Sequence, residues 1–104
     1  MKNFIIINTS YKKLSEAKKL AQILLSKKLA ACVQMQKIDS MFFWQNKLMQ
    51  EKEILVTIKT KANFYQKIVK EISENHPYQV PEIIAFSIDK ASEKYTKWVE
   101  NTVS

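Results

Sequence analysis

Residues 41–59 read MFFWQNKLMQEKEILVTIK, and this stretch decides the fold. In its second half, Ile54, Val56 and Ile58 share one parity, and this alternation predicts a strand. A turn is expected at Gln45-Asn46-Lys47, because asparagine tolerates a positive φ better than other non-glycine residues. The residues before the turn supply the partner strand. The stretch therefore predicts a long antiparallel hairpin.

Hydrophobic periodicity gives the remaining elements on both sides of this hairpin. A continuous β-branched run is typical of a buried strand, and apolar residues spaced near 3.6 are typical of an amphipathic helix. The expected elements are a strand at 4–7, a helix at 11–29 capped by Thr9 and Ser10, hairpin strands at 30–44 (irregular near Asp39-Ser40) and 48–59, a helix capped by Thr60 that ends before Pro77, a strand at 83–88, and a helix after 89–92. The order β-α-β-β-α-β with an extra C-terminal helix predicts one α+β domain, residues 1–104, with a ferredoxin-like arrangement.

Apolar side chains occupy both parities of the hairpin, which indicates that both of its faces are buried. The two sets are Leu55 against Ile54 and Val56, and Phe42 and Trp44 against Met41 and Phe43. Two helices on one face of a four-stranded sheet leave its other face without cover. We expect another copy of the chain to cover that face, with the strand of Ile54 and Val56 in the interface.

The composition argues against several classes of protein. Glycine is absent, so the chain has neither a dinucleotide-binding fingerprint nor a P-loop. All 17 basic residues are lysine, and the lack of arginine argues against bidentate recognition of nucleic acid. No apolar run reaches the roughly 20 residues that span a bilayer, and residues 1–8 do not resemble a secretory signal. Because Cys32 is the only cysteine, a reducing compartment such as the cytoplasm is expected.

Three residues are candidates for a site, although no catalytic or zinc-binding spacing is present, so an enzyme is not expected. Cys32 is expected to pack as a small buried hydrophobe at the start of a strand. His76 is the only histidine, and the loop that it opens holds both prolines of the chain, which make the loop rigid. Glu82 has two interpretations. In the first, it is hydrated or paired with a lysine such as Lys59. In the second, it lines a pocket at the sheet edge with His76 and Tyr78.

Five segments together resemble the divalent-cation tolerance proteins, the CutA family. They are HPYQVPEII at 76–84, LAACV at 29–33, SMFFW at 40–44 with KL at 47–48, EILVTIKT at 53–60, and YTKWV at 95–99. They follow the order and spacing of the family and cover essentially the whole chain. The chain departs from the family pattern at Phe42 in place of tyrosine, at Asn46 in place of glycine, and at Gln79 in place of an acidic residue.

The resemblance implies a homotrimer whose fold and assembly are similar to those of the PII signalling proteins. It implies tolerance of copper and other divalent metal ions, with weak metal binding at His76 and no enzymatic activity or other cofactor. It also implies a cleft between subunits that is lined by Trp44, Lys59, Tyr78 and Glu82. The expected partners are further copies of the chain and divalent metal ions, with no nucleic acid and no membrane. Two alternatives stay open, a PII-like sensor of a small ligand and a passive trimeric scaffold.

Overall fold

The computed structural model describes residues 3–104, and its elements follow the predicted order. They are β1 (Phe4–Tyr11), α1 (Leu14–Ser26), β2 (Cys32–Trp44), β3 (Lys47–Lys61), the 3-10 turn η1 (Ala62–Phe64), α2 (Tyr65–Asn75), β4 (Ile84–Ser87) and α3 (Glu93–Thr102). Every strand and helix that periodicity predicts is present. The mixed α+β class is therefore confirmed.

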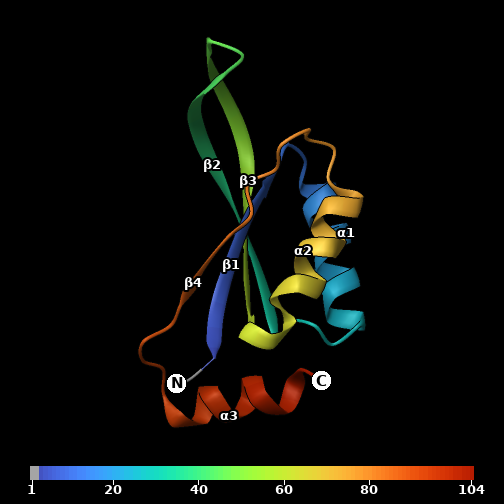
Figure 1. Cartoon of the computed structure of the whole chain (residues 1–104), viewed down its shortest axis with the longest axis vertical. Helices are drawn as coiled ribbons and strands as arrows, with labels where there is room; N and C mark the ends of the chain where they lie inside the picture. Colours follow the sequence, from blue (N-terminus) through green and yellow to red (C-terminus); the bar gives the residue numbers. More distant parts are fainter. Residues whose placement is uncertain (1–2) are drawn as a thin grey trace.

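The four strands form one antiparallel sheet in the order β2-β3-β1-β4. Figure 1 shows α1 and α2 side by side on one face of this sheet, with α3 across its lower end. β1 pairs with β3 only as far as Tyr11 opposite Ile54, so the hairpin of β2 and β3 extends beyond the rest of the sheet (Figure 1). We call this extension, residues 38–53, the arm.

The core lies between the sheet and the α1–α2 layer, and one parity of β3 supplies much of it. Ile54 is 7% exposed, and Val56 and Ile58 have no exposed surface. The other side chains that are almost fully buried in this core include Ile7, Leu20, Leu24, Ile68, Ile72 and Val99. Ile54 and Val56 themselves do not form a surface between subunits as expected, because this parity packs inside the chain itself. An interface through the other parity of the same strand stays a prediction.

β1 is longer than predicted, and α1 is correspondingly shorter. The two predicted caps, Thr9 and Ser10, lie within β1, which continues to Tyr11 and stays paired with β3. α1 instead begins after Lys13, whose backbone N–H donates to the carboxylate of Glu16. Pairing with β3 satisfies the backbone groups at the end of β1, so the hydroxyls of these residues are not needed as caps.

Thr60 is a further predicted cap that has another role. It lies near the end of β3, fully buried, and its Oγ1 donates to the carbonyl oxygen of Leu29 at 2.6 Å. This bond ties β3 to the segment that follows α1. α2 begins only at Tyr65, after η1.

The hairpin turn is where the sequence predicts it. Gln45 and Asn46 have φ values of 50° and 65°, and two successive residues with positive φ are typical of the tight turns that match the twist of a hairpin. The predicted irregularity near Asp39 is absent, since Asp39 pairs with Lys52 in an unbroken ladder. The arm is therefore a regular two-stranded ribbon.

Candidate functional site

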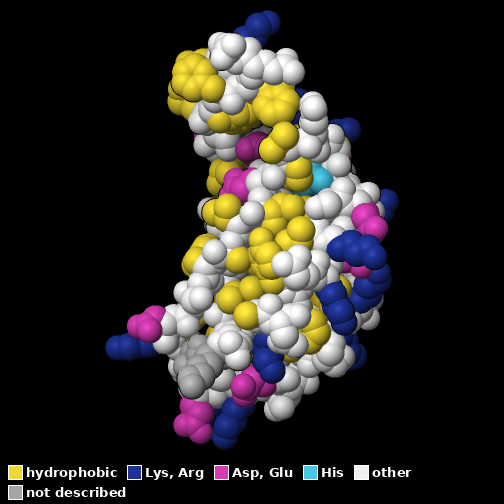
Figure 2. Space-filling model, viewed as in Figure 1, with side chains coloured by type: hydrophobic (Ala, Val, Ile, Leu, Met, Phe, Trp, Pro, Cys, Tyr) yellow, Lys and Arg dark blue, Asp and Glu magenta, His cyan; other side chains and the backbone are white. Residues whose placement is uncertain are grey.

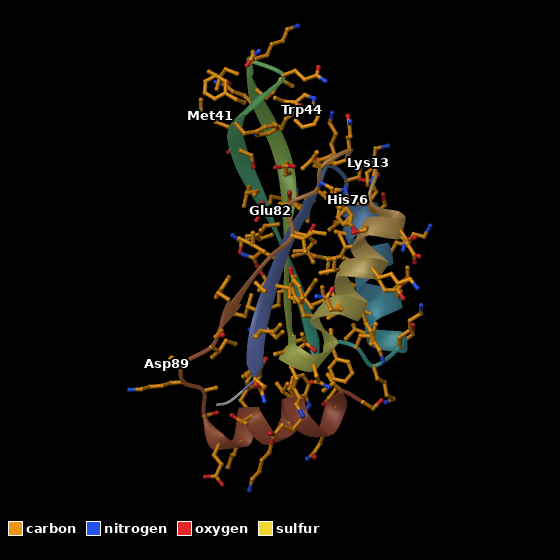
Figure 3. All side chains as sticks on the ribbon, viewed as in Figure 1. Lys13, Met41, Trp44, His76, Glu82 and Asp89 are labelled. Atoms are coloured by element: carbon orange, nitrogen blue, oxygen red, sulfur yellow. The ribbon has the colours of Figure 1, made fainter. Side chains whose placement is uncertain are left out.

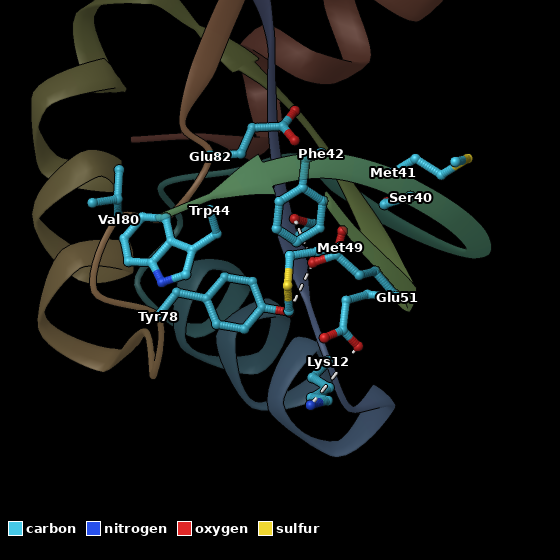
Figure 4. Close-up of a pocket in the computed structure, with 12 residues that line it drawn as sticks. Lys12, Ser40, Met41, Phe42, Trp44, Met49, Glu51, Tyr78, Val80 and Glu82 are labelled. Carbon is cyan, nitrogen blue, oxygen red and sulfur yellow. Dashed lines mark hydrogen bonds and ion pairs between the residues drawn. The ribbon is translucent and has the colours of Figure 1, made fainter. Parts of the chain in front are cut away.

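A pocket of about 510 Å³ lies between one face of the arm and the 78–82 segment (Figure 4). Its side chains are of three main kinds: carboxylates, aromatic rings and thioethers. They are Glu51, Glu53 and Glu82; Phe42, Trp44 and Tyr78; and Met41 and Met49, with Ser10, Lys12, Ser40 and Val80 completing the wall. The pocket is thus acidic and aromatic, although the net charge of the chain is +7.

The register of the hairpin explains why the arm side chains of this lining, except Met41 of the opposite parity, share one surface. Ser40 pairs with Glu51, and Phe42 pairs with Met49. Paired residues point to the same face of a sheet, and alternate residues along a strand also share a face. Glu53 therefore joins Glu51 on the pocket face. The connection between α2 and β4 crosses this face, and Tyr78 closes the pocket from that side (Figure 4).

Glu53 is the most deeply buried carboxylate of the pocket, with 7% of its surface exposed. Its Oε2 accepts a hydrogen bond from Tyr78 Oη at 2.7 Å and another from Ser10 Oγ at 3.4 Å. Burial and the bond to Glu53 raise the pKa of the Tyr78 phenol, because its ionised form would be poorly solvated and would face a carboxylate. Tyr78 is thus a fixed hydrogen-bond donor at neutral pH.

His76 contacts Tyr78, with ring centroids 4.7 Å apart, and is not among the residues that line the pocket. Its ring stacks on that of Tyr11, with centroids 4.1 Å apart. The backbone N–H of Tyr78 donates to Nδ1 at 3.1 Å, so the proton of the neutral ring is on Nε2, which donates to the carbonyl oxygen of Ser10 at 2.6 Å. Burial lowers the pKa of His76, opposed by the Ser10 bond and by two carboxylates nearby. Both ring nitrogens of the neutral imidazole are therefore engaged.

Three of the four residues predicted for the cleft meet in this pocket: Trp44, Tyr78 and Glu82. Figure 3 shows His76 and Glu82 near the base of the arm and Trp44 towards its tip. Glu82 is exposed, precedes β4, and makes no ion pair with a lysine within residues 3–104. Its exposure agrees with the first interpretation, a hydrated carboxylate, and the second is met only in part, because Glu82 and Tyr78 line the pocket but His76 does not. That this pocket is also a cleft between subunits stays a prediction.

Lys59, the fourth predicted residue, lies elsewhere. Its Nζ is 5.7 Å from the ring centroid of Tyr95, and its partner across the strands is Cys32. Cys32 is only half-buried and not fully buried as predicted, since it starts a strand at the edge of the sheet. Burial, together with the neighbouring Cys32, raises the pKa of Tyr95. Lys59, Cys32 and Tyr95 therefore form a cluster that is separate from the pocket.

Sequence reasoning missed nine of the twelve side chains of the pocket, and four of these are Ser10, Met49, Glu51 and Glu53. A usable signal exists for three of them. Once the turn is placed at residues 45–46, counting back along both strands pairs residue 42 with 49 and residue 40 with 51, which fixes the shared face. Ser10 has no such local signal, because it reaches the pocket through the pairing of β1 with β3.

A family model described as "CutA1 divalent ion tolerance protein" matches residues 5–102, which is nearly all of the chain. The chain belongs to this family. The resemblance found in the five sequence segments is thereby confirmed. The CutA1 family is named for tolerance of divalent ions and not for a catalysed reaction.

Two relatives in the CutA1 family that match over nearly their full lengths are from Pyrococcus horikoshii and Archaeoglobus fulgidus, whereas one from Arabidopsis thaliana is matched over 54% of its length. The divalent-cation tolerance protein CutA of Pyrococcus horikoshii is 32% identical over 95 residues, which cover 91% of this chain and 93% of the relative. CutA of Archaeoglobus fulgidus is 35% identical over 99% of both chains. The solved structure of the Archaeoglobus fulgidus protein, titled a periplasmic divalent cation tolerance protein, superimposes with a TM-score of 0.94 at 32% identity, covering 97% of this chain and 99% of that one.

The metal role that the CutA resemblance implies for His76 stays a prediction. Within residues 3–104, no three histidine, cysteine or carboxylate side chains are grouped so that they could hold a metal ion. A metal bound at Nδ1 of His76 would have to displace the hydrogen bond from the Tyr78 N–H. Across the same part of the chain, no helix is long and apolar enough to cross a membrane.

Proposed function

We propose that this chain works as a cytoplasmic homotrimer of ferredoxin-like subunits in the tolerance of copper and other divalent metal ions, which it binds weakly. The family description and the names of the relatives, which refer to divalent ions, support the role in tolerance. The strand order β2-β3-β1-β4 supports the ferredoxin-like topology. The single cysteine supports a reducing compartment, although a relative from Arabidopsis thaliana is named chloroplastic.

The exposed apolar surface of the arm is the observation that carries the assembly. Met41, Phe43 and Leu48 share one face of the arm, and their exposed fractions are 64%, 76% and 57%. Figure 2 shows apolar side chains gathered at the end of the arm, beyond the main body of the chain. A contiguous patch of this kind is typical of a protein–protein interface. Symmetric association of identical chains is the commonest way to bury it in soluble oligomers.

Replacing Phe43 tests the assembly without disturbing the core, because its side chain lies in the solvent-exposed arm. Phe43→Glu places a charge in the proposed interface, where it is costly to bury without a partner. We expect light scattering after size-exclusion chromatography to give a trimer for the unaltered chain and a folded monomer for Phe43→Glu. Gln22→Glu, on the exposed side of α1, adds the same charge as a control and should stay trimeric. A monomeric unaltered chain, or a trimeric Phe43→Glu variant, would contradict the proposal.

The hydrogen bonds of His76 support weak rather than tight metal binding by a single copy. Its Nδ1 already accepts from the Tyr78 backbone, and its Nε2 donates to the Ser10 carbonyl oxygen. A metal ligand must offer a free lone pair on one ring nitrogen. Binding of a metal at Nδ1 must therefore break the hydrogen bond from the Tyr78 N–H, and the free energy that this costs weakens the binding.

Calorimetric titration of the trimer with copper(II) chloride tests direct binding. We expect a weak, saturable heat that is lost in His76→Gln and retained in Gln22→Glu. Heat that is unchanged in His76→Gln would place the metal on other ligands. No heat with the unaltered trimer would contradict direct binding and favour the passive scaffold.

A further inference from the structure

The pocket at the base of the arm offers many hydrogen-bond acceptors and few donors. Glu51, Glu53 and Glu82 line it, and ionised carboxylates only accept. Lys12 is the one cationic side chain in its lining, and its Nζ already lies 3.9 Å from Oε2 of Glu51. Among residues 3–104, neither Glu53 nor Glu82 has a cationic partner. The pocket is therefore suited to a cation and unsuited to a phosphate or another anion.

Glu53 is the carboxylate of the pocket with the least exposed surface. It is 7% exposed, and both of its hydrogen bonds, from Tyr78 and from Ser10, end on Oε2. Within the described part of the chain, Oε1 of Glu53 accepts no hydrogen bond, and the side chain belongs to the pocket wall. A carboxylate that is buried without a counter-ion is unfavourable unless its charge is compensated. A bound cation would supply that charge.

The remaining walls indicate that this cation carries a hydrocarbon group. Phe42 and Trp44 are each 39% exposed, so part of each ring is open to the pocket side. With Met49 they form an apolar wall, and Figure 4 shows these side chains facing Tyr78 across the pocket. Aromatic faces attract both apolar groups and ammonium ions, and thioethers adapt to irregular apolar ligands. A bare metal ion would leave these walls unused.

We propose that this pocket binds a small primary amine with an apolar body, in its ammonium form. The ammonium group has three N–H donors, which suit Oε1 of Glu53, the carboxylate of Glu82 and the hydroxyl of Ser40. The hydrocarbon part packs between the rings of Phe42 and Trp44. A volume of about 510 Å³ falls in the range of small-molecule sites in proteins. This ligand class is distinct from the divalent metal ions of the proposed function.

A pair of ligands that differ only in charge tests the proposal on the assembled protein. 2-Phenylethylammonium carries the cation and a ring, and 2-phenylethanol is its neutral counterpart of almost the same size. We expect calorimetry to detect saturable binding of the first and at least tenfold weaker binding of the second. Equal binding of both would overturn the role of the carboxylates, and no binding of either would overturn the site.

Glu82→Gln removes one pocket charge at an exposed position, where the side chain makes no hydrogen bond to any of residues 3–104. We expect it to weaken binding of 2-phenylethylammonium by roughly threefold to tenfold, as for a partly exposed ion pair. Glu74→Gln, on α2 and outside the pocket, removes the same charge and should bind as the unaltered protein does. Equal affinities of the two variants would overturn the proposal. The oligomeric state and the copper titration of Glu82→Gln are expected to stay unchanged, which keeps this test separate from that of the proposed function.

Discussion

The phenol of Tyr78 donates a 2.7 Å hydrogen bond to Oε2 of Glu53. The bond joins the segment after α2 to the base of the arm, across 25 positions of the sequence. The same carboxylate oxygen accepts from Ser10 of β1, so Glu53 links three parts of the chain. The candidate site is consequently held by polar contacts as well as by the apolar core.

Tyr78→Phe removes the donor from this buried carboxylate and keeps the ring. Hydrogen bonds to charged groups contribute about 1.5–3 kcal/mol, so we expect a decrease of this size in the free energy of unfolding. Urea denaturation at a fixed protein concentration measures it, since assembly makes the apparent stability depend on concentration. Tyr65→Phe is the matched control, because the hydroxyl of Tyr65 makes no hydrogen bond within residues 3–104. Equal losses in the two variants would show that the bond to Glu53 contributes nothing.

Tyr11→Phe, unlike Tyr78→Phe, is not expected to lower the stability of the chain at neutral pH. The Tyr11 side chain is 1% exposed, and its hydroxyl has no hydrogen-bond partner in the described part of the chain. Removing a buried polar group that makes no bond lowers a desolvation cost. We expect the free energy of unfolding to stay equal or to rise by about 1 kcal/mol, with the stacking on His76 preserved. A clear loss of stability would show that the hydroxyl is bonded in solution.

The stability of the chain should fall at alkaline pH, in part because of Tyr11. Burial, helped by Glu16, raises the pKa of Tyr11 from 10.0 to about 12. The folded state then holds this proton more tightly than the unfolded state, so the contribution is complete below pH 10 and is lost as the pH rises towards 12. Unfolding measured from pH 9 to 11.5 should show a steeper decline for the unaltered chain than for Tyr11→Phe. Parallel declines would contradict the raised pKa.

His76 should make the chain sensitive to mild acid. Burial lowers its pKa below 6.5, so the unfolded state takes up the proton more readily than the folded state. The stabilising contribution is present above pH 6.5 and is lost as the pH falls through the folded pKa. We expect the free energy of unfolding to drop between pH 7.5 and pH 5.5, and to drop less in His76→Gln. Because the chain has one histidine, an NMR titration of its ring gives the folded pKa directly, and a value above 6.5 would contradict this expectation.

Local pattern accounts for the parts of the fold that were predicted correctly. Alternation in β3, the spacing of apolar residues in the helices and the Gln45-Asn46 turn each involve neighbours in the chain. The errors fall where a distant strand supplies the competing interaction. Ser10 has cap chemistry, but pairing with β3 keeps it in a strand, and the hydroxyl of Thr60 is drawn to the carbonyl oxygen of Leu29.

The residues of the candidate site also fall into two groups, those that the sequence predicted together and those whose position only the fold decides. Trp44, Tyr78 and Glu82 were predicted as one group from the family resemblance, and all three line the pocket. Within the single chain, Lys59 lies apart from these three residues, beside Tyr95 and Cys32, and its place in a cleft between subunits stays a prediction. Sequence gives a residue type and its parity, but the distance between two loops depends on the path of the chain between them.

The sequence by itself determined the order of the elements, the long hairpin and the CutA1 family, since periodicities and motifs are local properties. Only the tertiary structure decided that Glu53 lies buried beneath Tyr78 and beside Ser10, and that Ile54 and Val56 face the core of their own chain. Ser10 and Glu53 are 43 positions apart. Their contact follows from the register of β1 on β3, and strand register is set by how the whole apolar face packs against the helices.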